Sequence, residues 1–235
     1  EMCIRDSTYT ILYIVALVVI VGSALALTAM ALKPMQKANA DADKMRQILS
    51  AVHITADKDK IISVFDSTVT DQFTVNSCGE RTSDDAFSIN VAAQTKLPAD
   101  SRELPVYVCR IADGSDKYVL PVYGAGLWGP IWGYVALNSD GSTVYGAYFA
   151  HQGETPGLGA EIEKPAFSDQ FDGKQMFKGS QFLPVTVVKA GQKPAGDEDY
   201  VDAISGGTIT SKGVAAMLDG CLKPYENYLR TLRNE

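Results

Sequence analysis

Histidine is scarce in this sequence, and its cysteines are not arranged in pairs. The 235 residues hold only two histidines, His53 and His151, which lie far apart in the chain. A histidine-based metal site therefore lacks ligands, and a hydrolase built on Ser205 and His151 lacks the Gly-x-Ser-x-Gly elbow. No Cys-x-x-Cys pair occurs, which argues against a zinc or iron–sulfur site within the chain. The four cysteines are Cys3, Cys78, Cys109 and Cys221.

Basic residues are too few for a nucleic-acid-binding protein. The chain has 21 Lys and Arg against 28 Asp and Glu, a formal net charge of −7. Binding to a phosphate backbone requires a basic patch, and no run of like charge supplies one. Gly206-Gly207-Thr208 also lacks the Gly-Lys-Ser/Thr ending of a nucleotide P-loop. The sequence thus excludes a nucleic-acid partner and a P-loop nucleotidase.

Charge is absent from Ser7 to Leu32, and the stretch from Ile11 to Leu27 is nearly all aliphatic. A helix of this length crosses a hydrocarbon core of about 30 Å, so we predict a membrane-spanning helix over residues 8–32. The alternative is a cleaved signal peptide, for which Ser23–Ala26 resembles a cleavage site. A signal peptide has a shorter apolar core, which favours a retained helix.

The segment after the apolar run predicts a stalk helix over residues 33–52, since its apolar residues recur at helical spacing. Its basic residues outnumber those before the apolar run, where Arg5 stands alone. The positive-inside rule by itself would put the large domain in the cytoplasm. The basic residues of the stalk are Lys33, Lys37, Lys44 and Arg46.

The rest of the chain predicts an α+β domain with a central, mainly antiparallel sheet and flanking helices. Two hairpins are expected, one across Asp113-Gly114-Ser115 and the other across Asn138–Gly141. Their strands are predicted at residues 106–111, 117–122, 133–137 and 144–150, with a further strand at 183–189. Helices are expected at residues 57–69 and 212–233, the latter kinked by Pro224. Residues 71–100 are mixed and polar, and we expect them to be peripheral.

The segment from Asp202 to Ser211 places hydroxyls and glycines before the terminal helix. A helix start offers unpaired N–H groups and a partial positive charge, and therefore suits a phosphate. Gly206 and Gly207 let the backbone approach such a group, and Thr208 or Thr210 could bond the phosphate or carry it covalently. The alternative is an ordinary N-cap.

This segment resembles the flavinylation motif Asp-x-x-Ser/Thr-Gly-Ala-Thr of proteins that carry FMN through a threonine phosphoester. Two further stretches, Leu120–Gly129 and Gln152–Glu161, resemble the C subunit of the sodium-translocating NADH:quinone oxidoreductase, and the three motifs stand in the order of that family. The chain departs from the motif at Gly207, where the family usually has Ala.

The resemblance implies a covalent FMN on Thr208, with Asp202 read by the flavin transferase that attaches it. Thr210 and Ser211 are expected to bond the phosphate or cap the helix. Two glycine-rich loops, Gly124–Gly129 and Glu154–Gly159, are expected at opposite ends of the second hairpin, and the resemblance implies that they line the isoalloxazine ring. Core packing is the alternative for Trp128. Together with Ser205, Gly206 and Gly207, the expected cofactor-binding residues are Leu127, Trp128, Glu154, Thr155, Gly157 and Leu158.

The resemblance further implies an electron-carrying component of a bacterial inner-membrane complex that oxidises NADH, reduces quinone and pumps Na⁺. The implied partners are an FMN-bearing membrane subunit and iron–sulfur membrane subunits, and the soluble domain of this single-pass chain would be periplasmic, against the charge count. The alternatives are the G subunit of an Rnf-type ferredoxin:NAD oxidoreductase and a non-redox, membrane-anchored binding domain.

The expected organisation has four parts: an uncertain N-terminus at 1–7, a transmembrane helix at 8–32, a stalk helix at 33–52 and an FMN-binding domain at 53–235. Residues 1–7 do not fit the family, and no role is assigned to Cys3. In a periplasmic domain Cys78 and Cys109 could form a disulfide, or both could be apolar thiols.

Overall fold

The computed structural model describes residues 2–233, with side chains from Thr8 onward. The chain divides into two compact units, residues 1–44 and 45–235. The first unit is formed by helix α1 (Met2–Ala51), whose last turns belong to the second unit. The region expected as an uncertain N-terminus lies outside the described side chains.

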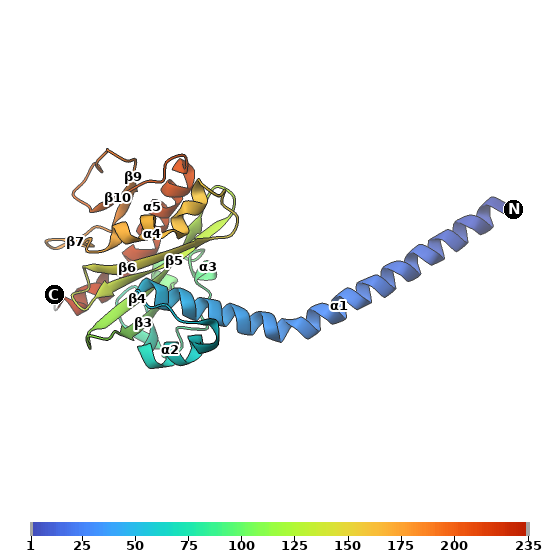
Figure 1. The fold of residues 1–235 in the computed structure, drawn as a ribbon, viewed down its shortest axis with the longest axis horizontal. Helices are drawn as coiled ribbons and strands as arrows, with labels where there is room; N and C mark the ends of the chain where they lie inside the picture. The colour runs from blue at the N-terminus through green and yellow to red at the C-terminus, as the bar shows by residue number, and fades with distance from the viewer. Residues whose placement is uncertain (1, 234–235) are drawn as a thin grey trace. The chain divides into compact units, whose positions relative to one another are not determined.

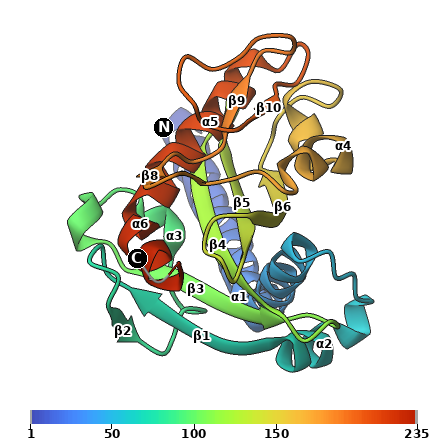
Figure 2. The same ribbon diagram turned by 90° about the vertical axis from the view of Figure 1, so that its left-hand side faces the viewer.

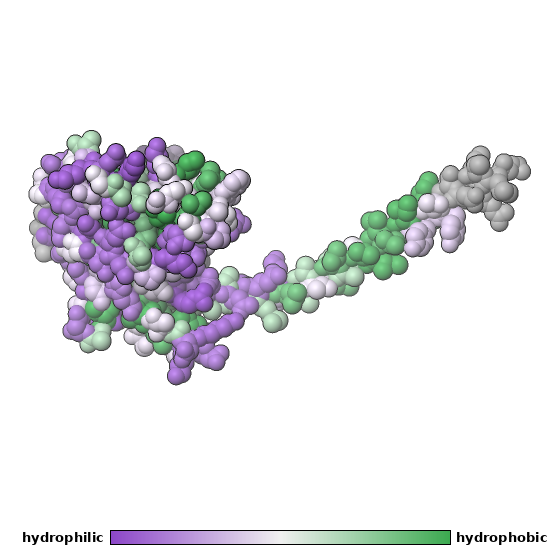
Figure 3. Space-filling view, turned by 45° about the horizontal axis from the view of Figure 1, so that its top comes forward, coloured by the Kyte–Doolittle hydropathy of each residue, from purple (hydrophilic) through white to green (hydrophobic). Residues whose placement is uncertain are grey.

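Helix α1 is the one helix in the described part of the chain that is long and apolar enough to cross a membrane. Its large apolar side chains, from Tyr9 to Met35, are exposed, and Figure 3 shows this part of the helix as mostly green. The helix runs on without a break from the expected span into the expected stalk, with Pro34 inside it. The compact second unit begins at Met45, so the end of the expected stalk is part of the domain.

The second unit is built on a six-stranded sheet in the order β2-β1-β3-β4-β5-β6, and all its pairings are antiparallel. The α+β prediction is therefore confirmed, as are the two hairpins that join β3 to β4 and β5 to β6. The strands are β1 (Val69–Val75), β2 (Arg81–Ser83), β3 (Leu104–Arg110), β4 (Asp116–Ala125), β5 (Pro130–Asn138) and β6 (Val144–His151).

Two small sheets and several helices surround this sheet (Figure 1). Strand β7 (Phe177–Lys178) pairs with β8 (Gln181–Phe182), and β9 (Thr186–Val188) pairs in parallel with β10 (Tyr200–Asp202). The helices are η1 (Lys58–Lys60), α2 (Ile61–Thr68), α3 (Val91–Gln94), η2 (Ala99–Ser101), η3 (Gly159–Glu163), α4 (Pro165–Ser168), η4 (Asp169–Phe171), α5 (Thr208–Leu222), η5 (Lys223–Tyr225) and α6 (Glu226–Leu232).

Helices cover both faces of the sheet because successive strand residues point to opposite faces. On one face α5 lies against β4 and β5 (Figure 2), and its apolar side chains Val214, Met217 and Leu218 join the main core. On the other face the last turns of α1 bury Ile48 and Leu49, and the indole of Trp132 on β5 donates a 3.0 Å hydrogen bond to Gln47. Helix α5 thus packs on one face of the sheet and the last turns of α1 on the other.

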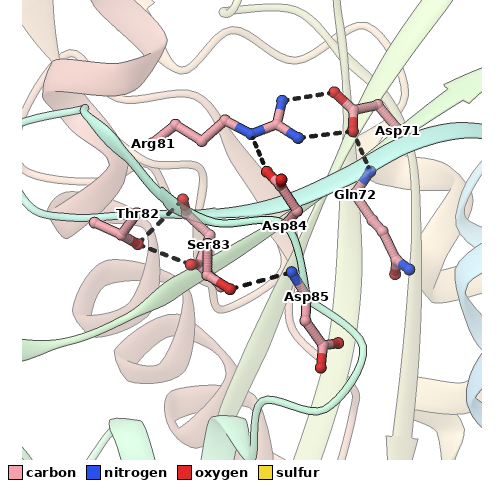
Figure 4. A network of polar contacts seen from close by, with 8 residues as sticks. Asp71, Gln72, Arg81, Thr82, Ser83, Asp84 and Asp85 are labelled. Carbon is pink, nitrogen blue, oxygen red and sulfur yellow. Dashed lines mark hydrogen bonds and ion pairs between the residues drawn. The ribbon is translucent and has the colours of Figure 1, made fainter.

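The expectation that residues 71–100 are peripheral is wrong for residues 71–75, because β1 occupies the second position of the sheet and buries Phe73 and Val75. Its outer neighbour β2 is short and charged, which discourages pairing with another chain. Figure 4 shows Arg81 donating hydrogen bonds to Asp71, at 2.8 and 3.0 Å, and to Asp84, at 2.8 Å. These bonds from Arg81 lower the pKa of the Asp71 carboxyl.

Candidate functional site

Thr208 is the first residue of helix α5, four residues before the expected helix start. Gly207 occupies the N-cap position without a side-chain cap, and Gly206 before it has a φ of +75°, which a glycine adopts without strain. The Thr208 side chain is exposed, whereas Thr210 and Ser211 are 1% and 2% exposed. Of the two threonines considered as phosphate carriers, only Thr208 is open to solvent.

Thr210 and Ser211 lie inside the first turn of α5, so neither caps the helix, which was one of the two roles expected of them. The other role, a bond to the phosphate, stays a prediction. The Thr210 hydroxyl donates a 2.5 Å hydrogen bond to Oε2 of Glu154. The Ser211 hydroxyl accepts a 3.1 Å hydrogen bond from the backbone N–H of Ile204. Both hydroxyls therefore connect the helix to neighbouring segments of the domain.

The two glycine-rich loops lie at the same end of the β5–β6 hairpin, and the prediction of opposite ends is wrong. In an antiparallel hairpin the start of one strand faces the end of the other, and here Ile131 pairs with His151. The loop before β5 and the loop after β6 consequently meet. The backbone N–H of Trp128 donates a 2.8 Å hydrogen bond to Oε1 of Glu154.

Apolar side chains are exposed on both loops and on the first turn of α5. Trp128 is 68% exposed, so the alternative of core packing is wrong for this residue. Leu158 lies against Gly206, since a Cβ at that glycine would meet the Leu158 side chain. Solvent-exposed apolar groups beside an exposed hydroxyl are suited to a flat aromatic ligand attached there. The group consists of Leu127, Trp128, Leu158 and Ile209.

A cavity of about 530 Å³ lies beside Thr208 and is also lined by Ser205 and Gly206. Three lysines line it: Lys212 from α5, and Lys189 and Lys193 from the loop after β9. Helix N–H groups and ammonium groups both attract anions, so this cavity fits a phosphate ester on Thr208. The sequence did not single out Lys189 and Lys193, because their place beside α5 depends on the pairing of β9 with β10.

The remaining expected site residues serve loop geometry or lie at the edge of the site. The carbonyl of Thr155 accepts hydrogen bonds from Leu158 and Ala160, at 3.1 and 3.2 Å. The N–H of Gly157, where φ is +75°, donates to Glu161 at 3.1 Å. Asp202 ends β10 with an exposed side chain. Among the described residues, no group of three or more His, Cys, Asp or Glu could hold a metal ion.

Both Cys109 and Cys78 are free thiols, the first buried and the second exposed. Desolvation raises the pKa of the Cys109 thiol to about 12, so it behaves as an inert apolar group. Cys221 on α5 is buried as well, and its thiol donates to the Tyr123 carbonyl at 3.3 Å. The Cys3 side chain lies outside the described residues.

Comparison with known proteins identifies both the domain and its relatives. The FMN-binding domain family matches residues 126–223, a range that contains Trp128, Glu154 and Thr208. The C subunit of the Na(+)-translocating NADH-quinone reductase of Vibrio vulnificus is 34% identical over 207 residues, which are 81% of each chain. The corresponding protein of Neisseria meningitidis is 31% identical over 223 residues, covering 87% of this chain and 85% of that protein.

Two solved structures share the fold. The crystal structure of the C subunit from Parabacteroides distasonis has a TM-score of 0.79 and 46% identity, covering 84% of this chain and 96% of that one. The crystal structure of NqrC from Shewanella oneidensis has a TM-score of 0.69 and 25% identity, covering 84% of this chain and 100% of the other. The chain therefore belongs to the C-subunit family of the Na⁺-translocating NADH-quinone reductase.

Proposed function

We propose that this chain carries electrons within a Na⁺-translocating NADH:quinone reductase, using an FMN joined by its phosphate to the hydroxyl of Thr208. The observation that carries the proposal is the exposed Thr208 hydroxyl at the start of α5, on a cavity lined by three lysines. The membership of the chain in the C-subunit family and the match of residues 126–223 to FMN-binding domains favour this function over the G subunit of an Rnf-type complex.

Exposure and hydrogen bonding support Thr208 over Thr210 as the attachment point. A hydroxyl that is to receive a phosphoryl group must be reachable by the flavin transferase. Thr210 is buried and its proton is committed to Glu154, whereas Thr208 is exposed. The start of α5 and the nearby Lys212 offset the negative charge of the resulting phosphodiester.

The exposed apolar side chains of the two loops and of the first turn of α5 support the expected position of the ring. An attached isoalloxazine can lie on Trp128, Leu158 or Leu127, which are 68%, 42% and 49% exposed. FMN supplies the redox chemistry, accepting and releasing electrons, while the protein supplies attachment, orientation and polarity. A ring held on an open surface stays accessible to electron-transfer partners.

The proposed partners are the other subunits of the complex and the flavin transferase, which would read Asp202 ahead of the acceptor. We propose that electrons arrive from an iron–sulfur membrane subunit and leave to an FMN-bearing membrane subunit. Helix α1 would span the bacterial inner membrane once, with the domain on the periplasmic side. The long apolar part of α1 and membership in a membrane-complex family support membrane association.

Intact mass spectrometry of the full-length chain tests the attachment. The chain is co-expressed with a flavin transferase in a host that exports it, beside Thr208→Ala and the control Ser67→Ala, which removes an exposed hydroxyl of α2 outside the motif and the cavity. We expect the mass of FMN less one water, with yellow in-gel fluorescence, in the wild type and Ser67→Ala but not in Thr208→Ala. Fluorescence surviving in Thr208→Ala would place the link elsewhere. A colourless, unmodified wild type would indicate a non-redox binding domain.

A further inference from the structure

Glu154 is a buried carboxylate at the meeting point of three segments. It is 4% exposed, although it lies in a loop and was expected to contact the cofactor. Its Oε1 accepts from the N–H of Trp128 at 2.8 Å, and its Oε2 accepts from the hydroxyl of Thr210 at 2.5 Å. We name this arrangement of Glu154, Trp128 N–H and Thr210 hydroxyl the Glu154 bridge.

The loops are shaped to admit this carboxylate. A Cβ at Gly126 would collide with Oε1 of Glu154, and a Cβ at Gly159 would collide with its Oε2 and with the Thr210 hydroxyl. On the remaining side, the N–H of Glu154 donates to Nδ1 of His151 at 3.1 Å. Glycines therefore stand where the carboxylate passes, and the backbone of Glu154 is itself held in place.

No Lys or Arg within the described residues forms an ion pair with Glu154. Burying a carboxylate without a cation is unfavourable unless its oxygens accept good hydrogen bonds. An aliphatic residue would serve a purely structural contact at lower cost. The arrangement instead gives directional bonds that fix the angle between the loop of Trp128 and the first turn of α5.

We infer that Glu154 is a positioning residue for the flavin, holding Trp128 and the start of α5 in register without touching the ring. The inference rests on the proposed attachment of FMN to Thr208. Thr208 and Thr210 share one helical turn, and Trp128 is one of the exposed side chains proposed to carry the ring. The Glu154 bridge thereby connects the attachment point of the flavin to the surface on which it lies.

The pair Glu154→Gln and Glu154→Ala separates positioning from charge. Gln keeps a carbonyl oxygen for the Trp128 N–H, and its amide can donate to the Thr210 hydroxyl, which then acts as acceptor. Glu154→Ala removes both bonds. If Glu154 acts by positioning, Glu154→Gln should behave like the wild type. If the negative charge itself matters, Glu154→Gln should lose function as Glu154→Ala does. Glu161→Ala is the matched control, because Glu161 accepts from Gly157 within the same loop.

Two readouts on the full-length protein in detergent test the inference. Without flavin, we expect the Trp128 amide to exchange roughly tenfold or more faster in Glu154→Ala, because a charge-assisted hydrogen bond is lost, and at nearly the wild-type rate in Glu154→Gln and Glu161→Ala. With flavin attached, we expect a fall in flavin fluorescence anisotropy in Glu154→Ala alone. Wild-type amide exchange and anisotropy in Glu154→Ala would overturn the inference. Equal changes in Glu154→Gln and Glu154→Ala would overturn it as well.

A second pair of variants decides the matter if Glu154→Ala does not fold. Thr210→Ser keeps the hydroxyl and Thr210→Val removes it at nearly constant volume. We expect flavin anisotropy to fall in Thr210→Val and to stay unchanged in Thr210→Ser. Equal anisotropy in the two variants would refute the inference. A wild type without flavin would refute the attachment at Thr208, while the exchange of the Trp128 amide would still report on the bridge.

Discussion

Gly159→Ala is expected to destabilise the domain by displacing the Glu154 bridge. A Cβ at this position would lie on Oε2 of Glu154 and on the Thr210 hydroxyl, and 3.2 Å from the Cβ of Glu154. Both side chains are buried, at 4% and 1% exposure, so neither can rotate into open space. The new methyl group therefore breaks the hydrogen bond between them or pushes the loop away from α5.

The magnitude follows from these two possibilities. Overpacking a methyl group costs about 1–3 kcal/mol, and losing a hydrogen bond to a charged group costs about 1.5–3 kcal/mol. Moving the side chains apart relieves the overpacking but breaks the hydrogen bond, so the two costs do not add. We expect the free energy of unfolding to fall by about 2–3 kcal/mol in total. For a domain of this size the melting temperature should fall by about 4–12 °C.

Gly153→Ala is the matched control, because it adds the same methyl group in the same loop with no atom within 4 Å. Its melting temperature should stay close to that of the wild type, since an unstrained Gly-to-Ala change is worth only about 0.4–1 kcal/mol. Thermal unfolding of the full-length protein in detergent, followed by near-UV circular dichroism, measures both. Equal melting temperatures for Gly159→Ala and Gly153→Ala would refute the steric reasoning.

Two further predictions concern pH and thiol accessibility. Burial raises the pKa of four groups, those of Tyr107, Tyr225, Tyr228 and Cys109. Above about pH 9 the unfolded chain therefore releases protons that the folded domain retains, and the free energy of unfolding should fall as the pH rises further. Equal urea midpoints at pH 7.5 and 10.5 would contradict this. In a Cys3→Ser variant, a membrane-impermeant maleimide should label the exposed Cys78, but not the buried Cys109 or Cys221, in intact spheroplasts. Labelling only after permeabilisation would put the domain in the cytoplasm.

The sheet was largely predictable because its hairpins are marked by local turn residues. Asp113-Gly114-Ser115 lies between β3 and β4, and Ser139–Gly141, which follows the last residue of β5, lies between β5 and β6, as expected. Strand β1 was missed because its first half, Val69–Gln72, is only partly buried and mostly polar, and pairing with β3 rather than composition makes it a strand. Lengths of strands and helix starts were less accurate, as for α5, which begins at Thr208.

The Glu154 bridge could not be predicted, because it joins residues 26 and 56 positions apart in the sequence. Local patterns contain no information on such contacts; they depend on the hairpin bringing its two ends together. The two loops lie at the same end of the hairpin because its strands are antiparallel, and the contact between Trp128 and Glu154 follows from that arrangement. The lysines of the cavity were missed for a similar reason, since Lys189 and Lys193 occupy a polar loop without local features.

Helix geometry gives a reason, independent of the motif, why a single threonine in this segment can carry the flavin. Residues two positions apart on an α-helix point about 200° away from each other. When Thr210 faces the domain and donates to Glu154, Thr208 must face outward, as its exposure shows. The hydrogen bond between Thr210 and Glu154 thus also leaves Thr208 as the hydroxyl open to the proposed attachment. Without the Glu154 bridge the Thr210 hydroxyl is no longer held by a hydrogen bond, so traces of flavin on Thr210 should be found in Glu154→Ala but not in the wild type.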